Sequence, residues 1–165
     1  MDGSPPVSIP RLQTKRLTLR EYRMPDFDAF AAHVVESGYA DRKDAWRMFG
    51  CNTGSWLLQG AGWWAVEVRE TEEPVGTVGA FFREGSQEIE IGWNTYRAFR
   101  GRGFASEAAA EAVRYALEVR GEQRVTALIR PGNAPSLRVA SHLGMRHEAD
   151  VELWGEQVGR HARAQ

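Results

Sequence analysis

The chain has 165 residues, close to the usual size of one compact domain, and its 42% hydrophobic and 26% charged residues are ordinary for a globular protein. We therefore expect residues 1–165 to form a single domain in which residues 1–10 are flexible. The formal net charge is only -1 at pH 7 and no long run of Lys or Arg occurs, so nucleic acid is not an expected partner.

No stretch approaches the ~18 apolar residues that a membrane span requires, and the first ten residues lack the apolar core of a secretory peptide. We therefore expect no membrane association and a cytoplasmic location. Cys51 is the only cysteine, which excludes an intrachain disulfide and a cysteine-based metal cluster. The four histidines lack the close spacing of zinc ligands, so we expect no metal site and assign them surface or packing roles.

The first part of the chain predicts a strand followed by helices. Leu12–Arg20 alternates apolar and polar residues from Lys15 onward, which is the pattern of a half-buried strand. Apolar residues then recur at helical spacing after Pro25–Asp28, and this helix is expected to end near Gly38. Glycines interrupt the apolar face of Arg42 to Leu58, so we predict a helix, a turn and a short helix there.

Three strands are predicted in the middle of the chain. Gly62–Val68 and Pro74–Phe82 are rich in β-branched and aromatic residues and are joined by a polar turn, which indicates a hairpin. Glu88 to Thr95, which follows another turn, is expected to form the third strand.

The last part of the chain predicts helix, strand, helix and two weaker strands. An apolar stripe with helical period begins at Phe104, and this helix is expected to continue up to Gly121. The remaining elements are a strand at Val125 to Ile129, a helix after Asn133 that Gly144 stops, and strands at His147 to Leu153 and Val158 to Ala164. Together these elements predict an α+β domain with a mixed sheet.

The most informative segment is Arg100–Glu107, which lies between a predicted strand and the strongest predicted helix. Glycines at a helix start let the backbone approach a ligand, and the free N–H groups there form a site suited to a pyrophosphate. Arg100 and Arg102 are placed to add contacts with phosphates. The alternative is that Gly101 and Gly103 only make a tight turn. The spacing of a dinucleotide-binding or phosphate-loop NTPase motif is absent.

At these residues the sequence resembles the GNAT superfamily of acyltransferases, whose acetyl-CoA signature Q/R-x-x-G-x-G/A is matched by Arg100, Gly103 and Ala105. Glu90–Trp93 is similar to the E-I-G-Y strand of its Rim-type branch, the ribosomal-protein N-terminal acetyltransferase-like group. Further elements of that branch resemble Leu12–Arg20, Asn133–Val139 and Leu143–Met145. The resemblance therefore covers nearly the whole chain.

The resemblance implies a mixed, mostly antiparallel central sheet of about six to seven strands flanked by about four helices. It also implies that acetyl-CoA is bound, with backbone amides of Arg102 to Ser106 holding the pyrophosphate and the main chain of Trp93 and Thr95 holding the pantetheine arm. Asn133 would meet this arm, serve as a helix N-cap, or do both. The complete set of implied acetyl-CoA residues is Trp93, Thr95, Arg100, Gly101, Arg102, Gly103, Phe104, Ala105, Ser106, Asn133 and Ser136.

The sequence departs from the family pattern at three positions. Arg97 stands where proline is common, and Met145 replaces the usual aromatic residue after Leu-Gly. Ala140 stands where many other branches carry a tyrosine that protonates the departing thiolate. That role falls to another group or to none, and the resemblance makes Ser136 the best available donor.

Acetyl transfer to an amine needs a neutral nucleophile and stabilisation of the developing oxyanion. Glu88 and Glu90 lie two residues apart on one predicted strand, so their side chains share a face where a carboxylate can take the amine proton through a water. The resemblance favours such a strand acid as the base, with Glu90 ahead of Glu88. The alternative is that both are ordinary solvent-facing strand residues.

Cys51 has no recognisable histidine partner, so we expect it to be structural rather than nucleophilic. Four tryptophans either wall a substrate pocket or pack in the core, and packing is the more common role of large aromatic residues. These are Trp46, Trp56, Trp63 and Trp64.

The sequence therefore predicts an N-acetyltransferase that transfers the acetyl group of acetyl-CoA directly to a primary amine, either a protein N-terminus or a small molecule. The alternative is a non-catalytic acyl-CoA sensor with the same fold, which Ala140 makes conceivable. The intact Glu90 and Ser136 argue against that alternative. The sequence leaves both a monomer and a homodimer open.

Overall fold

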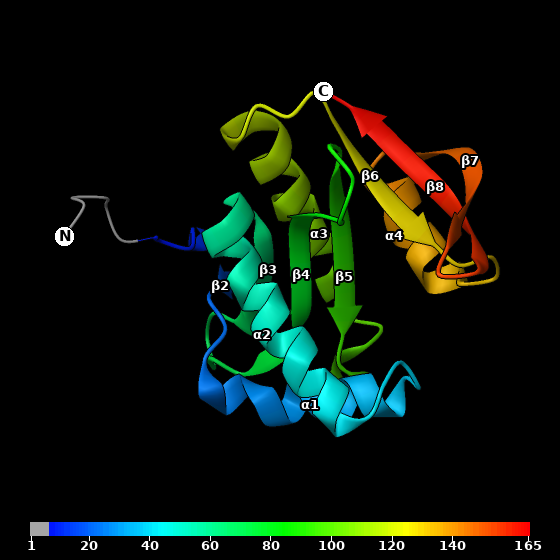
Figure 1. Ribbon diagram of the computed structural model, residues 1–165. Coiled ribbons are helices and arrows are strands. Elements are labelled where there is room, and N and C mark those ends of the chain that lie inside the picture. The colour runs from blue at the N-terminus through cyan, green and yellow to red at the C-terminus, as the bar shows by residue number, and fades with distance from the viewer. Residues whose placement is uncertain (1–6) are drawn as a thin grey trace.

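The structure is a computed structural model that describes residues 7–165. Its centre is one eight-stranded sheet with the strand order β1-β2-β3-β4-β5-β6-β8-β7, and helices lie on both faces of that sheet (Figure 1). Neighbouring strands are antiparallel except for the parallel pair β5 and β6. The predicted α+β class and the mixed, mostly antiparallel sheet are confirmed, with eight strands where about six to seven were expected.

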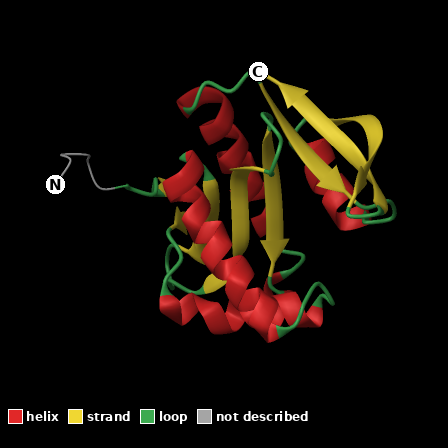
Figure 2. Ribbon diagram, viewed as in Figure 1, coloured by secondary structure: helices red, strands yellow, loops and turns green. Residues whose placement is uncertain are grey.

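Strands and helices are distinguished by colour in Figure 2. The strands are β1 (Leu12–Gln13), β2 (Leu17–Arg20), β3 (Gly62–Val68), β4 (Pro74–Phe82), β5 (Ile89–Thr95), β6 (Arg124–Ile129), β7 (Arg146–Leu153) and β8 (Glu156–Ala164). The main helices are α1 (Phe27–Glu36), α2 (Arg42–Gln59), α3 (Phe104–Arg114), which continues as a π-helical turn over Tyr115–Val119, and α4 (Ala134–His142). The predicted elements coincide with these to within a few residues, except in two segments.

The first exception is Leu12–Arg20, which was predicted as one strand and is a tight hairpin of β1 and β2. Thr14 closes the turn, because its N–H donates to Leu17 O at 2.9 Å and its hydroxyl oxygen accepts from Leu17 N–H at 2.9 Å. Leu12 therefore pairs back with Leu19. Both arms of a hairpin keep a period of two, so alternation alone does not reveal the reversal.

The second exception is α2, which is one continuous 18-residue helix. The interruption that we predicted within Arg42 to Leu58 is therefore wrong. A glycine inside a helix costs roughly 1 kcal/mol relative to alanine. Burial of Phe49 and Trp56 on the inner face of α2, together with the N-cap Asp41, offsets the cost of its two glycines.

The two faces of the sheet carry separate apolar clusters. α3 packs on one face, where its buried Ala108 and Ala112 belong to the larger cluster. α1 and α2 cross the other face, where Tyr22, Phe30 and Phe49 belong to the smaller cluster. Figure 1 shows α2 in front of the sheet and α3 behind it. Small side chains on α3 let that helix lie close to the strands.

Strands β5 and β6 are joined along only part of their length. Their parallel pairing comprises Ile89 with Val125 and Glu90 with Thr126, and the two strands then diverge (Figure 1). The edge of β5 beyond Glu90 has no strand partner on that side within residues 7–165, although its other edge stays paired with β4. This divergence leaves main-chain groups of β5 free for a ligand.

The start of the described chain is attached to the sheet. Trp64 Nε1 donates to Pro10 O at 2.8 Å, and Ile9 packs against the larger cluster. We predicted that residues 1–10 are flexible. Residues 1–6 of that segment lie outside the described residues. Within residues 7–165, no helix has both the length and the apolar character to cross a membrane.

Candidate active site

The glycine-rich segment forms a sharp loop at the start of α3. Gly101 and Gly103 have φ angles of +77° and +78°, in the left-handed region that favours glycine. Because α3 begins at Phe104, the amides of its first turn have no partner inside the helix. Together with the helix dipole, these amides are suited to bind an anion, and the anion site itself stays a prediction.

A groove of about 680 Å³, here called the helix groove, runs from this loop to the start of α4. Its charged side chains are basic, with Arg100 beside the loop and Arg138 on α4. Residues expected to hold acetyl-CoA that line the helix groove are Trp93, Thr95, Arg100, Gly101, Gly103, Phe104, Ala105, Ser106, Asn133 and Ser136. Arg102 is the exception and does not line the groove; its guanidinium lies 5.6 Å from the centre of the Phe99 ring. The groove therefore suits an anionic ligand.

A second space of about 630 Å³, here called the sheet cavity, lies on the face of β5 that α1 and α2 cover. The tip of the β7–β8 hairpin also reaches it, through Leu153, Trp154 and Glu156. Six residues line both the helix groove and the sheet cavity: His33, Tyr39, Trp93, Asn94, Asn133 and Ser136. The two spaces therefore meet at the diverging end of β5.

Glu90 is a buried carboxyl at the wall of the sheet cavity. Arg83 donates to both of its oxygens, from Nη2 at 2.8 Å and from Nε at 3.0 Å. Burial raises the pKa of Glu90 above the usual carboxyl range, while the bonds and the charge of Arg83 oppose this rise. A carboxylate with a raised pKa is a stronger proton acceptor than a solvated one.

Glu88 precedes β5 and lies outside the residues that line either space. Its carboxylate forms an ion pair with Arg124 Nε at 2.8 Å, and its side chain is 42% exposed. The structure therefore brings Glu90 to the sheet cavity and keeps Glu88 on the surface beside β6.

Asn133 and Ser136 form the start of α4. Asn133 is the N-cap, because its Oδ1 accepts from Ser136 N–H at 3.2 Å. Both residues also line the helix groove and the sheet cavity, so the capping role and a ligand-binding role are compatible. Ala140 is 1% exposed and packs in the larger apolar cluster. A hydroxyl on α4 near the junction of the two spaces can therefore come from Ser136.

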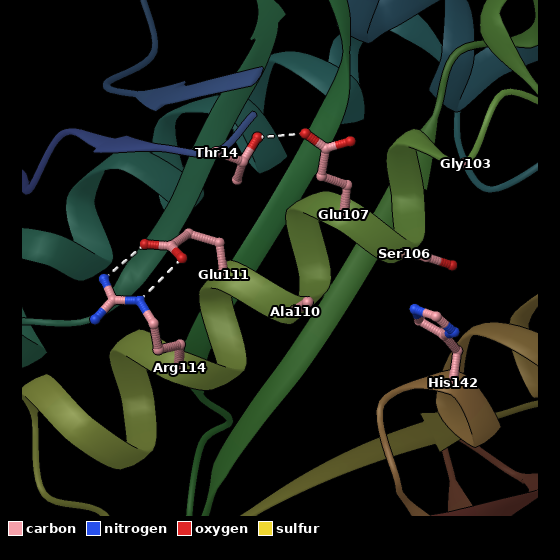
Figure 3. Close-up of a pocket in the computed structure, with 8 residues that line it drawn as sticks. All are labelled: Thr14, Gly103, Ser106, Glu107, Ala110, Glu111, Arg114 and His142. Atoms are coloured by element: carbon pink, nitrogen blue, oxygen red, sulfur yellow. Dashed lines mark hydrogen bonds and ion pairs between the residues drawn. The ribbon is translucent and has the colours of Figure 1, made fainter. Parts of the chain in front are cut away.

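Hydrogen bonds from the β1–β2 turn hold the glycine loop from outside. Arg16 Nη1 donates to Arg102 O at 2.9 Å, and Arg16 Nε donates to Glu107 Oε2 at 2.6 Å. Thr14 Oγ1 donates to Glu107 Oε1 at 2.6 Å (Figure 3). No sequence motif indicated this contact, because Arg16 and Glu107 are 91 residues apart. It fixes the first turn of α3 and the loop in one geometry.

A third hollow, of about 710 Å³ and here called the outer groove, lies between the outer side of α3 and α4. Figure 3 shows Ser106 on α3 and His142 on α4 pointing into the space between these helices. Both residues also line the helix groove. A ligand bound at the glycine loop can therefore extend from the helix groove into the outer groove.

Sequence reasoning gave His33 no specific role beyond packing or surface exposure, and the structure places it where the two spaces meet. Its ring lies 5.6 Å from that of Tyr96, and its Nε2 has no hydrogen-bond partner among the described residues. Burial lowers the pKa of His33 and so favours the uncharged ring, while the Asn94 side chain opposes this fall.

The four tryptophans fall into different environments. Trp56 and Trp64 are buried in the larger cluster, as the packing interpretation predicted. Trp46 is 51% exposed and packs edge-on against Phe27. Trp63 lines the sheet cavity, so only this member of the four walls a candidate substrate site.

The environment of Cys51 and the grouping of potential metal ligands bear on thiol and metal chemistry. Cys51 is exposed and lines neither the helix groove nor the sheet cavity. Within residues 7–165, no group of three or more His, Cys, Asp or Glu side chains is arranged to hold a metal ion.

Known proteins share this architecture. Residues 16–146 match the family model described as the acetyltransferase (GNAT) domain. Among curated proteins, the uncharacterized N-acetyltransferase YnaD of Bacillus subtilis (strain 168) is 29% identical over 145 residues, which cover 83% of this chain and 83% of YnaD.

Two solved structures illustrate the similarity of fold. The acetyltransferase of Agrobacterium tumefaciens str. C58 superposes with a TM-score of 0.88 at 27% identity, covering 100% of both chains. RimL, a ribosomal L7/L12 alpha-N-protein acetyltransferase in complex with coenzyme A, superposes with a TM-score of 0.72 and covers 92% of this chain and 95% of its own. Its identity is 18%, so it shows the fold alone.

The fold, the paired spaces and these relatives define an acetyltransferase. The chain belongs to the GNAT family, and its activity is acetyl-CoA-dependent acetyl transfer. The resemblance to the superfamily noted in the sequence is confirmed, whereas the Rim-type branch has only weak support. GNAT acetyltransferases take acetyl-CoA as the donor.

Proposed function

We propose that this chain is an N-acetyltransferase that transfers the acetyl group of acetyl-CoA directly to a primary amine. The observation that carries this proposal is the junction of two spaces at one strand end: the helix groove for the donor and the sheet cavity for the acceptor share six wall residues. Such a junction lets an amine meet the thioester without an acyl-enzyme.

In the donor site, we place the pyrophosphate on the first-turn amides of α3, between Gly103 and Ser106. The pantetheine arm lies along the unpaired edge of β5, where Trp93 and Thr95 offer main-chain groups. Arg100 and the outer groove accommodate the remaining charge and length of the donor.

In the reaction, the amine nitrogen attacks the thioester carbonyl carbon, so a C–N bond forms and the C–S bond breaks. The proton lost by the amine passes to the Glu90 carboxylate, directly or through a water. Each Glu90 oxygen keeps a lone pair beyond its bond to Arg83, so the carboxylate can still accept that proton. The thiolate leaves beside Ser136, whose hydroxyl donates a hydrogen bond to the sulfur.

The acceptor is a protein N-terminus or a small-molecule amine. The Rim-like motifs favour N-termini slightly, and RimL is a ribosomal L7/L12 alpha-N-protein acetyltransferase. The alternative of a non-catalytic acyl-CoA sensor has no support from the relatives, which are described as acetyltransferases.

The experiment is a measurement of thiol release from acetyl-CoA over a panel of amines and peptides, with products identified by mass spectrometry. Calorimetry on the same protein measures acetyl-CoA binding separately. We expect acetylation of at least one primary amine. Tight acetyl-CoA binding with no turnover on any acceptor would instead identify a sensor.

A further inference from the structure

The floor of the sheet cavity is a tryptophan laid flat across two strands. Trp63 on β3 pairs with Gly79 on β4, and Gly79 pairs with Gly92 on β5. Directly paired residues point to the same face of a sheet, so both glycines lie under the Trp63 side chain. A Cβ on Gly79 would come within 2.6 Å of Trp63 Cδ2, and one on Gly92 would overlap the far edge of the ring. The indole is therefore seated in a slot that only these glycines leave open.

Further aromatic groups extend this floor. The Phe81 ring lies 5.0 Å from the Trp63 ring at an interplanar angle of 30°, which is an offset stack. The guanidinium of Arg83 lies 5.7 Å from the centre of the Phe81 ring and 5.1 Å from that of Trp154. Phe81, Trp63 and Trp154 all line the cavity. The floor therefore presents aromatic side chains to a ligand in this space, with the Phe81 ring stacked on part of the indole.

The charges in the sheet cavity are already paired. Arg83 bonds to Glu90 at 2.8 Å, and Arg130 Nε bonds to Glu156 at 2.7 Å. These four residues are the Asp, Glu, Lys and Arg side chains that line the cavity. A polyamine or an aminoglycoside needs several free carboxylates to balance its additional ammonium groups, and the described lining supplies none.

We infer that the acceptor is a primary amine carried on a planar aromatic ring, which stacks on Trp63 while its amine lies between Glu90 and the junction. This inference rests on the proposed function, because it assigns the substrate class of the same cavity. The seated indole supplies a rigid face, so little conformational entropy is lost when a second flat ring stacks on it.

The test compares two amines that differ in planarity and share the same chain, 2-phenylethylamine and 2-cyclohexylethylamine. An aromatic stack favours the planar ring by about two- to tenfold beyond its apolar area. We therefore expect kcat/KM, and affinity measured by calorimetry with coenzyme A present, to favour 2-phenylethylamine by this factor. Spermidine and kanamycin serve as polycationic acceptors and are expected to be poorer.

Three variants locate the effect at the floor. Trp63→Leu should remove the preference for the planar ring, and Trp63→Phe should retain part of it. Gly79→Ala should act like Trp63→Leu, because Gly79 lines neither space and its new Cβ acts only by displacing the indole. Gly50→Ala on α2 is the matched control, since its Cβ meets nothing within 4 Å. Acetyl-CoA affinity should stay at the parental value in all four.

The outcomes separate this inference from the proposed function. Equal or better use of 2-cyclohexylethylamine, or a planar preference that survives in Trp63→Leu, overturns the aromatic acceptor while acetylation itself stands. If 2-phenylethylamine binds more tightly than 2-cyclohexylethylamine but no amine is acetylated, the proposed function is wrong and the aromatic binding site is retained. If Gly79→Ala fails to fold, Trp63→Phe and Trp63→Leu alone decide, because both are judged by the ratio between the two amines.

Discussion

The helix groove and the sheet cavity meet at one strand end but are built in different ways. The helix groove depends on main-chain geometry in one short segment, where Gly101 and Gly103 shape a loop before α3. The sheet cavity depends on side chains such as His33, Trp63 and Trp154 that are far apart in sequence. In the proposed function the donor is thus held by backbone, whereas the acceptor is selected by side chains that can vary without disturbing the donor.

The largest effect should come from blocking the donor side alone. We expect Gly103→Asp to weaken acetyl-CoA binding by roughly hundredfold or more, because it places a strained, negatively charged residue in the phosphate loop. Calorimetry measures this loss. Gly85→Asp is the matched control, since Gly85 also has a positive φ of +75° and lies in an open turn away from both spaces. If Gly103→Asp binds acetyl-CoA as tightly as the parent, the loop is not part of the donor site.

The next effect tests the acceptor side of the comparison. Glu90→Gln should lower kcat by about hundredfold through loss of the proton acceptor, and acetyl-CoA affinity should stay nearly unchanged. Glu88→Gln is the control, because Glu88 lies outside both spaces. If turnover falls in Glu88→Gln and not in Glu90→Gln, the base is Glu88.

The pH profile sharpens the same assignment. Burial raises the pKa of Glu90, so its base form is lost as the pH falls, at a higher pH than for an ordinary carboxyl. We expect kcat of the parent to decline on the acid side through this raised pKa, and Glu90→Gln to lack that decline. An identical acid limb in both proteins would assign it to another group.

A smaller effect is expected at the junction, where Ser136 belongs to both spaces. Ser136→Ala should lower kcat by about ten- to hundredfold if its hydroxyl stabilises the departing thiolate. Asn133→Ala removes the helix cap and should lower stability by about 1 kcal/mol. A lower melting temperature for Ser136→Ala with parental turnover, at a temperature where both are folded, would leave only the helix-start role.

The smallest effect concerns the support behind the loop. Arg16→Gln breaks the bonds to Arg102 O and Glu107, and we expect KM for acetyl-CoA to rise several-fold while KM for the amine and kcat stay close to parental values. Arg16→Lys keeps the charge but loses the forked geometry, so its KM for acetyl-CoA should lie between those of the parent and Arg16→Gln. Equal changes in both KM values would indicate a general loss of structure instead.

Most residues of the helix groove, the proposed donor site, could be predicted from the sequence, because glycines at a helix start constrain the backbone locally. The general base was harder to assign, because Glu88 and Glu90 lie on the same face of the predicted strand. They differ in their tertiary partners, which are Arg124 on β6 for Glu88 and Arg83 for Glu90. The Trp63 floor was not predictable at all. Predicting it requires the register of β3, β4 and β5, and register is set by tertiary packing rather than by any one segment.

The continuous α2 teaches the complementary lesson. Local rules predicted a break at its glycines, yet Phe49 and Trp56 pack well enough to hold the helix together. Tertiary contacts therefore overrode propensity in the same element that contributes Met48 and Asn52 to the sheet cavity.

The short pairing between β5 and β6 also has a mechanical consequence. In the strand pairing, only Ile89 and Glu90 on β5 join the β1–β5 part of the sheet to the β6–β8–β7 part, although the larger apolar cluster spans both. The free protein thus has a seam through its centre. In the proposed donor site, acetyl-CoA lies along β5 and against α4, so it spans that seam and supplies contacts that a longer strand pairing would otherwise make. Occupancy then couples the two halves, so that they resist unfolding as a single cooperative unit.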